Sequence, residues 1–246
     1  ANADSIEGNP RSPFHEDFAL ARIEQALREQ REARSGMPLL PRQERAESML
    51  YAAQMNAKSM QRITPHIPKS IPKERIAQQA EIALASFKAG VCVSANLSIG
   101  QFDSHANNDA DQMKLLPEFL AGIAYILRRA GELKIREKLV LVVQSEMGRT
   151  PDYNKGNGKD HWSIGSIMFI GPGIKGNRVL GATDEKQFAV PMNPKTLALD
   201  KEKGIRVRPE HIHEALRQYA GIANHSHAKK FPLGLSEKEQ LQGLWG

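Results

Sequence analysis

Acidic and histidine side chains gather in three short segments of the sequence, near positions 103, 146 and 161. Carboxylate oxygens and imidazole nitrogens are ligands through which proteins bind divalent cations, and several such groups together offset the cost of removing the ion from water. A cation held in this way can polarise a phosphoryl or sulfuryl oxygen, or lower the pKa of a bound water. The side-chain types therefore predict a divalent metal site whose candidate ligands are Asp103, His105, Glu146 and His161.

Three further charged side chains flank these candidate ligands. Arg149 lies three residues after Glu146 and can hold an anionic oxygen through two parallel hydrogen bonds. Lys159 supplies a second cation beside the third segment, and Asp160 can orient the imidazole of His161. We therefore expect Arg149 and Lys159 to bind substrate, and Asp160 to support the metal site through His161.

Each of these residues also has a purely structural interpretation. Asp103 can end a strand in an Asx turn, and His105 can be a solvated loop residue. Glu146 and Arg149 can form a surface ion pair, which contributes little to stability. The functional interpretation rests on the coincidence of three segments, each with ligand-type side chains close to a predicted strand.

The elements that must position these segments alternate between strand and helix. Residues 91–99 have the pattern of a buried strand, residues 109–130 that of an amphipathic helix, and residues 139–143 and 166–170 those of two further strands. This order is typical of a β-α-β unit, in which ligands bind beyond the carboxyl ends of the strands. We therefore predict an α/β fold with a mostly parallel sheet flanked by helices.

The first ninety residues contain no predicted strand. Apolar residues recur with helical spacing in residues 18–27 and 42–63, and again in residues 73–88. Three prolines before the last of these helices form a stiff connector, because proline fixes φ and lacks a backbone donor. The sequence therefore predicts a helical N-terminal region in residues 1–72 and an α/β core in residues 73–246.

The charge and the aromatic content of the chain limit the classes of partner that it is expected to bind. The 246 residues carry 34 Lys and Arg against 28 Asp and Glu, a net charge of +6, but the basic residues are spread thinly and only 6% of the chain is aromatic. A nucleic-acid groove usually has a concentrated basic stripe with aromatic side chains. No apolar run reaches the length of about 18 residues that a membrane span needs. We therefore expect neither a nucleic-acid partner nor a membrane span, and the sequence carries no signal for the oligomeric state.

Cysteine and histidine counts limit other metal sites. The single cysteine excludes both a disulfide within the chain and a zinc site built from thiolates. Four histidines lie near the C-terminus, and two of them fall two positions apart in a predicted helix, where their side chains do not share a face. We interpret these four as surface or core residues: His211, His213, His225 and His227.

Three motifs around the candidate ligands resemble those of a known family. Residues 101–108 resemble its Gly-Trp-Asp-Thr-His segment, residues 145–151 its Glu-Phe-Gly-Arg-Thr-Pro motif, and residues 158–162 its Gly-Arg-Asp-His-Trp motif. The family is a bacterial sulfatase-like domain of unknown function, numbered fifteen-oh-one, in the alkaline phosphatase superfamily. The resemblance covers roughly residues 75–222. It implies a phosphatase- or sulfatase-type α/β sandwich in a periplasmic or secreted protein.

The resemblance also implies roles for single residues. Asp103, His105 and His161 match the ligands of one metal, and Glu146 matches a carboxylate that helps to hold a second. Met147 stands where many members of the superfamily have His or Asn. The early strand with an Asp ligand and a nucleophile, which superfamily enzymes carry, has no counterpart in the first ninety residues. The chain is thus expected to be the C-terminal portion of a longer family member, or a member without that half.

Two functions follow as expectations. The first is metal-dependent hydrolysis of phosphate or sulfate esters, with a small anionic ester as substrate and zinc, calcium, manganese or magnesium as cofactor. This enzyme would be incomplete in the present chain, because no nucleophile is found. The alternative is a non-catalytic, exported scaffold or partner-binding protein that retains the fold.

Overall fold

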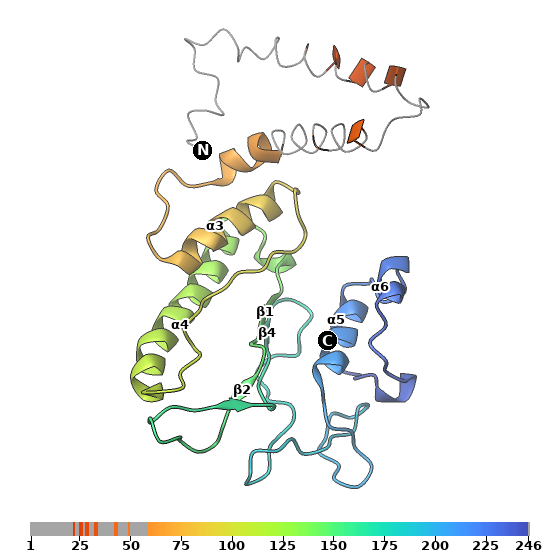
Figure 1. Cartoon of the computed structure of the whole chain (residues 1–246). Helices are drawn as coiled ribbons and strands as arrows, with labels where there is room; N and C mark the ends of the chain where they lie inside the picture. The colour runs from red at the N-terminus through yellow and green to blue at the C-terminus, as the bar shows by residue number, and fades with distance from the viewer. Residues whose placement is uncertain are drawn as a thin grey trace. The chain divides into compact units, whose positions relative to one another are not determined.

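A computed structural model describes the fold. It describes residues 59–245, together with residues 22, 25, 26, 28, 29, 32, 33, 42, 43 and 49. Most of the two helices predicted in residues 18–27 and 42–63 lies outside the described residues. The chain divides into two compact units, and Figure 1 labels their longer helices and several of their strands. Unit 1 comprises Ala1–Ile99 and Gly122–Leu133, and unit 2 comprises Gly100–Ala121 and Lys134–Gly246. The predicted boundary after residue 72 therefore falls inside unit 1.

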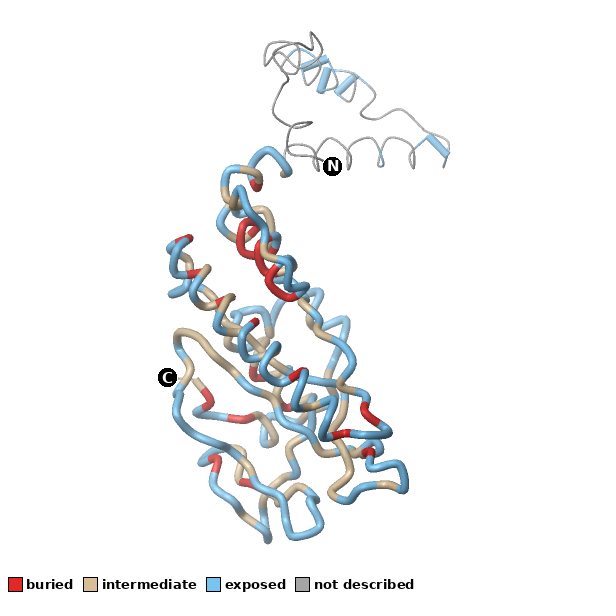
Figure 2. The backbone as a smooth tube through the Cα atoms, turned by 90° about the vertical axis from the view of Figure 1, so that its left-hand side faces the viewer, coloured by how far each residue is buried: buried red, intermediate tan, exposed pale blue. Residues whose placement is uncertain are grey.

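Two helices form the described core of unit 1. The helix predicted in residues 73–88 is confirmed as α3, Arg75–Lys88, whose buried positions are visible in Figure 2. The short 3-10 helix η2, Thr64–His66, precedes it. The second helix is the C-terminal half of α4, Asn108–Glu132, which continues past Pro117 as one helix. The two helices pack closely, because a Cβ atom at Gly122 would lie only 2.8 Å from the side chain of Ile76.

A buried ion pair links these two helices of unit 1. The carboxylate of Glu81, which is completely buried, accepts hydrogen bonds from Arg129 Nε at 3.0 and 3.1 Å and from the Tyr125 hydroxyl at 2.5 Å. Arg129 also donates to the carbonyl of His66 and to Glu132. Burial and the neighbouring Glu81 carboxylate raise the pKa of Tyr125 to about 12. Every charged or polar group in this cluster therefore has a partner.

Two small antiparallel sheets lie in unit 2. Strand β1, Leu141–Val143, pairs with β4, Met168–Ile170, and β2, Gly148–Arg149, pairs with β3, His161–Trp162. A parallel pair requires a crossover connection, usually a helix. Between β1 and β4 the chain instead forms the β2–β3 ribbon and returns in the opposite direction.

The described chain shows no parallel pair of strands where the β-α-β unit was predicted in residues 91–170, and the mostly parallel sheet stays a prediction. Residues 91–99 form no strand, and Val93 in the middle of that segment is fully exposed. The strands predicted in residues 139–143 and 166–170 do form, but they pair antiparallel. The wider prediction of a phosphatase- or sulfatase-type fold stays a prediction.

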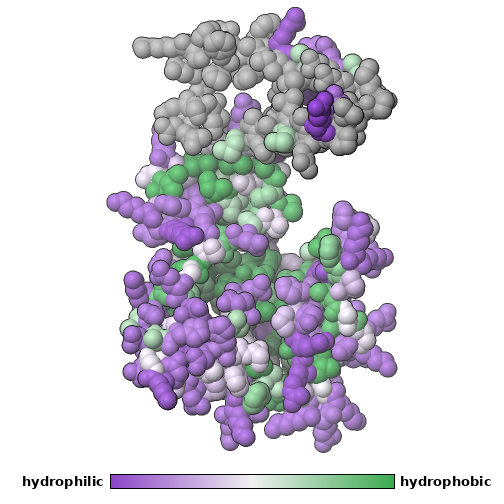
Figure 3. All heavy atoms as spheres, in the orientation of Figure 1, coloured by the Kyte–Doolittle hydropathy of each residue, from purple (hydrophilic) through white to green (hydrophobic). Residues whose placement is uncertain are grey.

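The C-terminal part of unit 2 has its own apolar core. Helix α5, Pro209–Tyr219, confirms the helix predicted there, and it is followed by α6, Ser226–Lys230. The short 3-10 helices of this unit are η3, Arg136–Lys138, and η4, Glu237–Glu239. The buried members of the core are Met192, Leu197, Ala215, Leu241 and Leu244. Hydrophilic side chains predominate over the face of this unit that Figure 3 shows.

One of the C-terminal histidines is buried on α5. His211 is only 1% exposed, and its Nδ1 atom accepts a hydrogen bond from the backbone N–H of Arg208 at 2.9 Å. Its Nε2 atom is buried without a hydrogen-bond partner, and burial lowers the pKa of the imidazole. His213 lies exposed on the same helix. In the described part of the chain, no helix combines the length and apolar character that a membrane crossing requires.

Candidate metal centre

Three of the four predicted metal ligands lie together in unit 2. Asp103, His105 and His161 each offer one ligand atom, and these atoms lie within 4.8 Å of one another. Asp103 Oδ1 is 3.1 Å from His105 Nδ1 and 3.4 Å from His161 Nε2. The side chains are 66%, 47% and 54% exposed, respectively, so the cluster is open to solvent. Two nitrogen donors and one carboxylate oxygen fit a divalent transition metal and leave its other coordination positions free.

The three ligands come from two segments that are joined through their backbones. The N–H groups of Asn107 and Asn108 donate to the carbonyls of Gly156 and Asn157, at 3.1 and 2.9 Å. In the other direction, the Lys159 N–H donates to the carbonyl of Ser104 at 3.0 Å. These bonds hold the segment that carries the first two ligands against the loop that leads to the third.

Gly158 allows this close approach. A Cβ atom at this position would lie 2.0 Å from the carbonyl carbon and oxygen of His105, so only glycine fits there. Gly156, two residues earlier, is less crowded, and the nearest atom to its Cβ position is 3.5 Å away. The backbone of His105 therefore packs directly against one glycine of the loop.

Ser104 anchors the first ligand segment to α4. Its side chain is buried, and its hydroxyl donates to Asn108 Oδ1 at 2.7 Å while accepting from Gln112 Nε2 at 3.2 Å. This serine lies between two candidate ligands in the sequence. Its burial and hydrogen bonds make it a positioning residue rather than an accessible nucleophile.

Asn154 is a positioning residue that the sequence analysis missed. Its Nδ2 atom donates to the carbonyl of His105 at 2.9 Å and to Asp160 Oδ1 at 3.0 Å. Its Oδ1 atom accepts from the N–H groups of Gly156 and Gly158 at 2.9 and 3.0 Å. The run of Asn and Gly in residues 154–158 is typical of a tight turn and was the available signal.

For two of the predicted roles, the described residues show no supporting contact. The carboxylate of Asp160 accepts from Asn154, and it makes no hydrogen bond to His161, which we expected it to orient. Glu146 is exposed and does not belong to the ligand cluster. Neither position could be fixed from the sequence, because adjacency along the chain does not determine the direction of a side chain.

Arg149 lies beside the cluster and contacts it directly. Its Nη2 atom donates a charge-assisted hydrogen bond to Asp103 Oδ1, and its Nη1 atom donates to the carbonyl of Lys159 at 3.1 Å. Arg149 is opposite His161 in the β2–β3 ribbon, which places both side chains on one face. The guanidinium, with a smaller contribution from His105, holds the pKa of Asp103 below its usual range.

The side chain of Lys159 is hydrogen bonded to backbone carbonyls in this structure. Its Nζ atom donates to the carbonyls of Thr150 and Pro151, at 3.1 and 2.6 Å, and lies 4.6 Å from the centre of the Tyr153 ring. The hydroxyl of Tyr153 in turn donates to Asp109 Oδ1 at 2.7 Å. The ammonium that we expected to bind substrate thus already has several partners.

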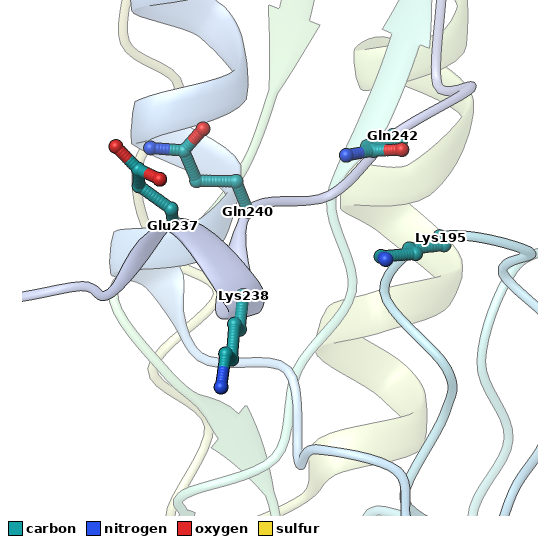
Figure 4. Close-up of a pocket in the computed structure, with 5 residues that line it drawn as sticks. All are labelled: Lys195, Glu237, Lys238, Gln240 and Gln242. Carbon is teal, nitrogen blue, oxygen red and sulfur yellow. The ribbon is translucent and has the colours of Figure 1, made fainter.

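A separate surface pocket of about 400 Å³ lies near the C-terminus of unit 2. Figure 4 shows its five lining residues, which include none of the candidate ligands: Lys195, Glu237, Lys238, Gln240 and Gln242. The pocket therefore does not form part of the candidate metal centre.

Comparison with known proteins gives one match. A family model described as "Protein of unknown function (DUF1501)" matches residues 9–201, which is more than half of the chain and includes the whole ligand cluster. No curated protein and no solved structure matches the chain.

Proposed function

This chain belongs to the DUF1501 family of proteins of unknown function, and we propose that it is a metal-dependent hydrolase of phosphate or sulfate esters. The observation that carries the proposal is the convergence of Asp103, His105 and His161, whose ligand atoms lie within 4.8 Å of one another. The motifs around these residues resemble those of sulfatase-like members of the alkaline phosphatase superfamily. That resemblance supports the ester class, the related fold and an exported location.

The donor set favours one class of cation. Two of the three ligand atoms are imidazole nitrogens, which suit zinc and other transition metals, whereas calcium and magnesium prefer oxygen ligands throughout. We therefore place zinc or manganese before calcium or magnesium. When bound, the cation would supply Lewis acidity at an ester oxygen.

The residues of the chain would have distinct tasks. Asp103, His105 and His161 would hold the cation at the surface of unit 2. The guanidinium of Arg149 lies next to Asp103 and can bind a non-bridging oxygen of a phosphate or sulfate group. Ser104 is buried and hydrogen bonded, so it does not supply the nucleophile.

Metal analysis of untagged protein tests the metal site. We expect about one equivalent of zinc or manganese per chain in the wild type and a loss of this metal in the double variant His105→Ala/His161→Ala. Glu146→Gln is the matched control, because Glu146 lies outside the cluster and its variant should keep the metal. Equal metal contents in the wild type and the double variant would refute the site.

A second candidate function is a non-catalytic, exported scaffold that binds a partner. Two observations favour it: Arg149 is already paired with Asp103, and Lys159 with two backbone carbonyls. Hydrolysis of p-nitrophenyl phosphate or p-nitrophenyl sulfate, lost in Asp103→Asn, would favour the enzyme. A protein that binds metal at this cluster but hydrolyses neither ester would favour the scaffold.

A further inference from the structure

A single carboxylate oxygen is shared within the cluster. Asp103 Oδ1 is the atom that faces both His105 Nδ1 and His161 Nε2, at 3.1 and 3.4 Å. The same Oδ1 atom accepts the hydrogen bond from Arg149 Nη2. A divalent cation between the three ligands would therefore face a carboxylate oxygen that a guanidinium already uses.

Contacts other than the hydrogen bond to Asp103 also hold Arg149 in this position. Its Nη1 atom is bonded to the Lys159 carbonyl, and its side chain is only 20% exposed, against 66% for Asp103. The β2–β3 register keeps it on the same face as His161. The guanidinium therefore places a positive charge within the site.

We propose that Arg149 competes with the metal ion for Asp103 and thereby lowers the affinity of the cluster for cations. This inference rests on the proposed metal site. Without the cation the guanidinium is the partner of Asp103, and a cation that binds must share this carboxylate with the guanidinium and approach its positive charge. Arg149 thus sets the concentration of free cation at which the site fills.

A positioning role for Arg149 predicts the opposite sign. If the guanidinium chiefly held Asp103 in the geometry of a ligand, its removal would disorder the carboxylate and weaken metal binding. Competition instead predicts that its removal strengthens binding. The direction of the change therefore separates the two roles, whatever its size.

Zinc titration of the full chain by calorimetry tests the proposal. Arg149→Gln removes the charge but retains an amide donor, and we expect it to bind zinc about tenfold more tightly than the wild type. Lys155→Gln is the matched control. It removes the same charge from an exposed loop residue that is not a member of the cluster, so its zinc affinity should change by less than about twofold.

The outcomes separate this inference from the proposed function. Zinc binding by Arg149→Gln that equals or falls below that of the wild type would overturn the competition, while the metal site itself would stand. If neither folded protein bound zinc, the metal site would fail and the inference with it. Far-UV circular dichroism monitors folding. Should Arg149→Gln not fold, Arg149→Lys decides, because its weaker hydrogen bond to Asp103 predicts binding a few-fold tighter than in the wild type.

Discussion

The side-chain amide of Asn154 donates a hydrogen bond of 2.9 Å to the main-chain carbonyl of His105. The substitution Asn154→Ala removes this bond and three others from the loop. We expect the free energy of unfolding to fall by about 1–2 kcal/mol, because the bonds are partly exposed to water, and the zinc affinity to fall with it. Urea denaturation and zinc titration measure the two effects. Lys155→Ala should match the wild type in both, and an unchanged Asn154→Ala protein would show that the backbone bonds suffice.

The two glycines of the same loop should respond differently to an added methyl group. Gly158→Ala would place a Cβ atom 2.0 Å from the carbonyl group of His105, and one of the two segments must then move. We expect a loss of about 3 kcal/mol in the free energy of unfolding, together with much weaker zinc binding. Gly156→Ala is the control, since its nearest neighbour would be 3.5 Å away. Similar stability of the two variants would contradict the close packing at Gly158.

In unit 1, the buried carboxylate that binds Arg129 should contribute far more to stability than the exposed carboxylate that binds the same arginine. Glu81 is fully buried and Glu132 is 53% exposed, although both bind Arg129. Glu81→Ala leaves the Arg129 guanidinium, which is only 15% exposed, without its main partner, and we expect it to cost about 3–5 kcal/mol of unfolding free energy. Glu132→Ala should cost less than about 1 kcal/mol. The comparison requires urea denaturation of both variants, and equal losses would count against the buried pair.

Acid should destabilise unit 2 through His211. Burial lowers the pKa of this imidazole below its ordinary value of 6.5, so the folded protein binds its proton less readily than the unfolded chain does. The stabilising contribution of the neutral His211 imidazole is complete above the pKa that this group has in the unfolded chain. It is lost as the pH falls through the pKa that the group has in the folded protein, by at most about 1.4 kcal/mol per pH unit. Protonation would also break the bond from the Arg208 N–H to Nδ1.

Urea denaturation between pH 7 and pH 5, about the ordinary histidine pKa, measures this dependence. In His211→Gln, the part of the pH dependence of the unfolding free energy that comes from this imidazole should disappear. His213→Gln is the matched control, because His213 is exposed on the same helix. An unchanged slope in His211→Gln would assign the acid sensitivity to other groups.

Helices were the most predictable elements of this fold. Apolar residues at helical spacing located α3, and Gly90, which adopts a φ of +65°, follows its end. Pro209 begins α5, where its missing N–H costs nothing. A helix satisfies its hydrogen bonds within one segment, so local sequence carries most of the information.

Strands were less predictable because they require a partner. The run from Val91 to Ile99 has the composition of a strand, but composition does not supply a neighbouring backbone, and the segment forms none. The apolar residues 139–143 and 166–170 contain β1 and β4, but burial gives no information on their relative direction. That direction follows from the path of the chain between them.

The candidate metal ligands could be predicted from the sequence, whereas the contacts of the residues around them could not. Asp103, His105 and His161 were identifiable by chemical type, and the structure brings them together. Arg149 pairs with Asp103, and Lys159 pairs with backbone carbonyls. Both contacts depend on the conformations of long side chains. Sequence spacing does not contain that information, nor does it show the four hydrogen bonds of Asn154.

The exposure of the three ligands has a kinetic consequence. All three are about half exposed or more, so hydrated ions in solution reach them without any opening of the fold. Entry of a cation would then be limited by its own dehydration and by its competition with Arg149 for Asp103, rather than by local unfolding. Occupancy would follow changes in the free cation concentration of the surroundings rapidly and reversibly, in contrast to a structural metal that is trapped when the chain folds.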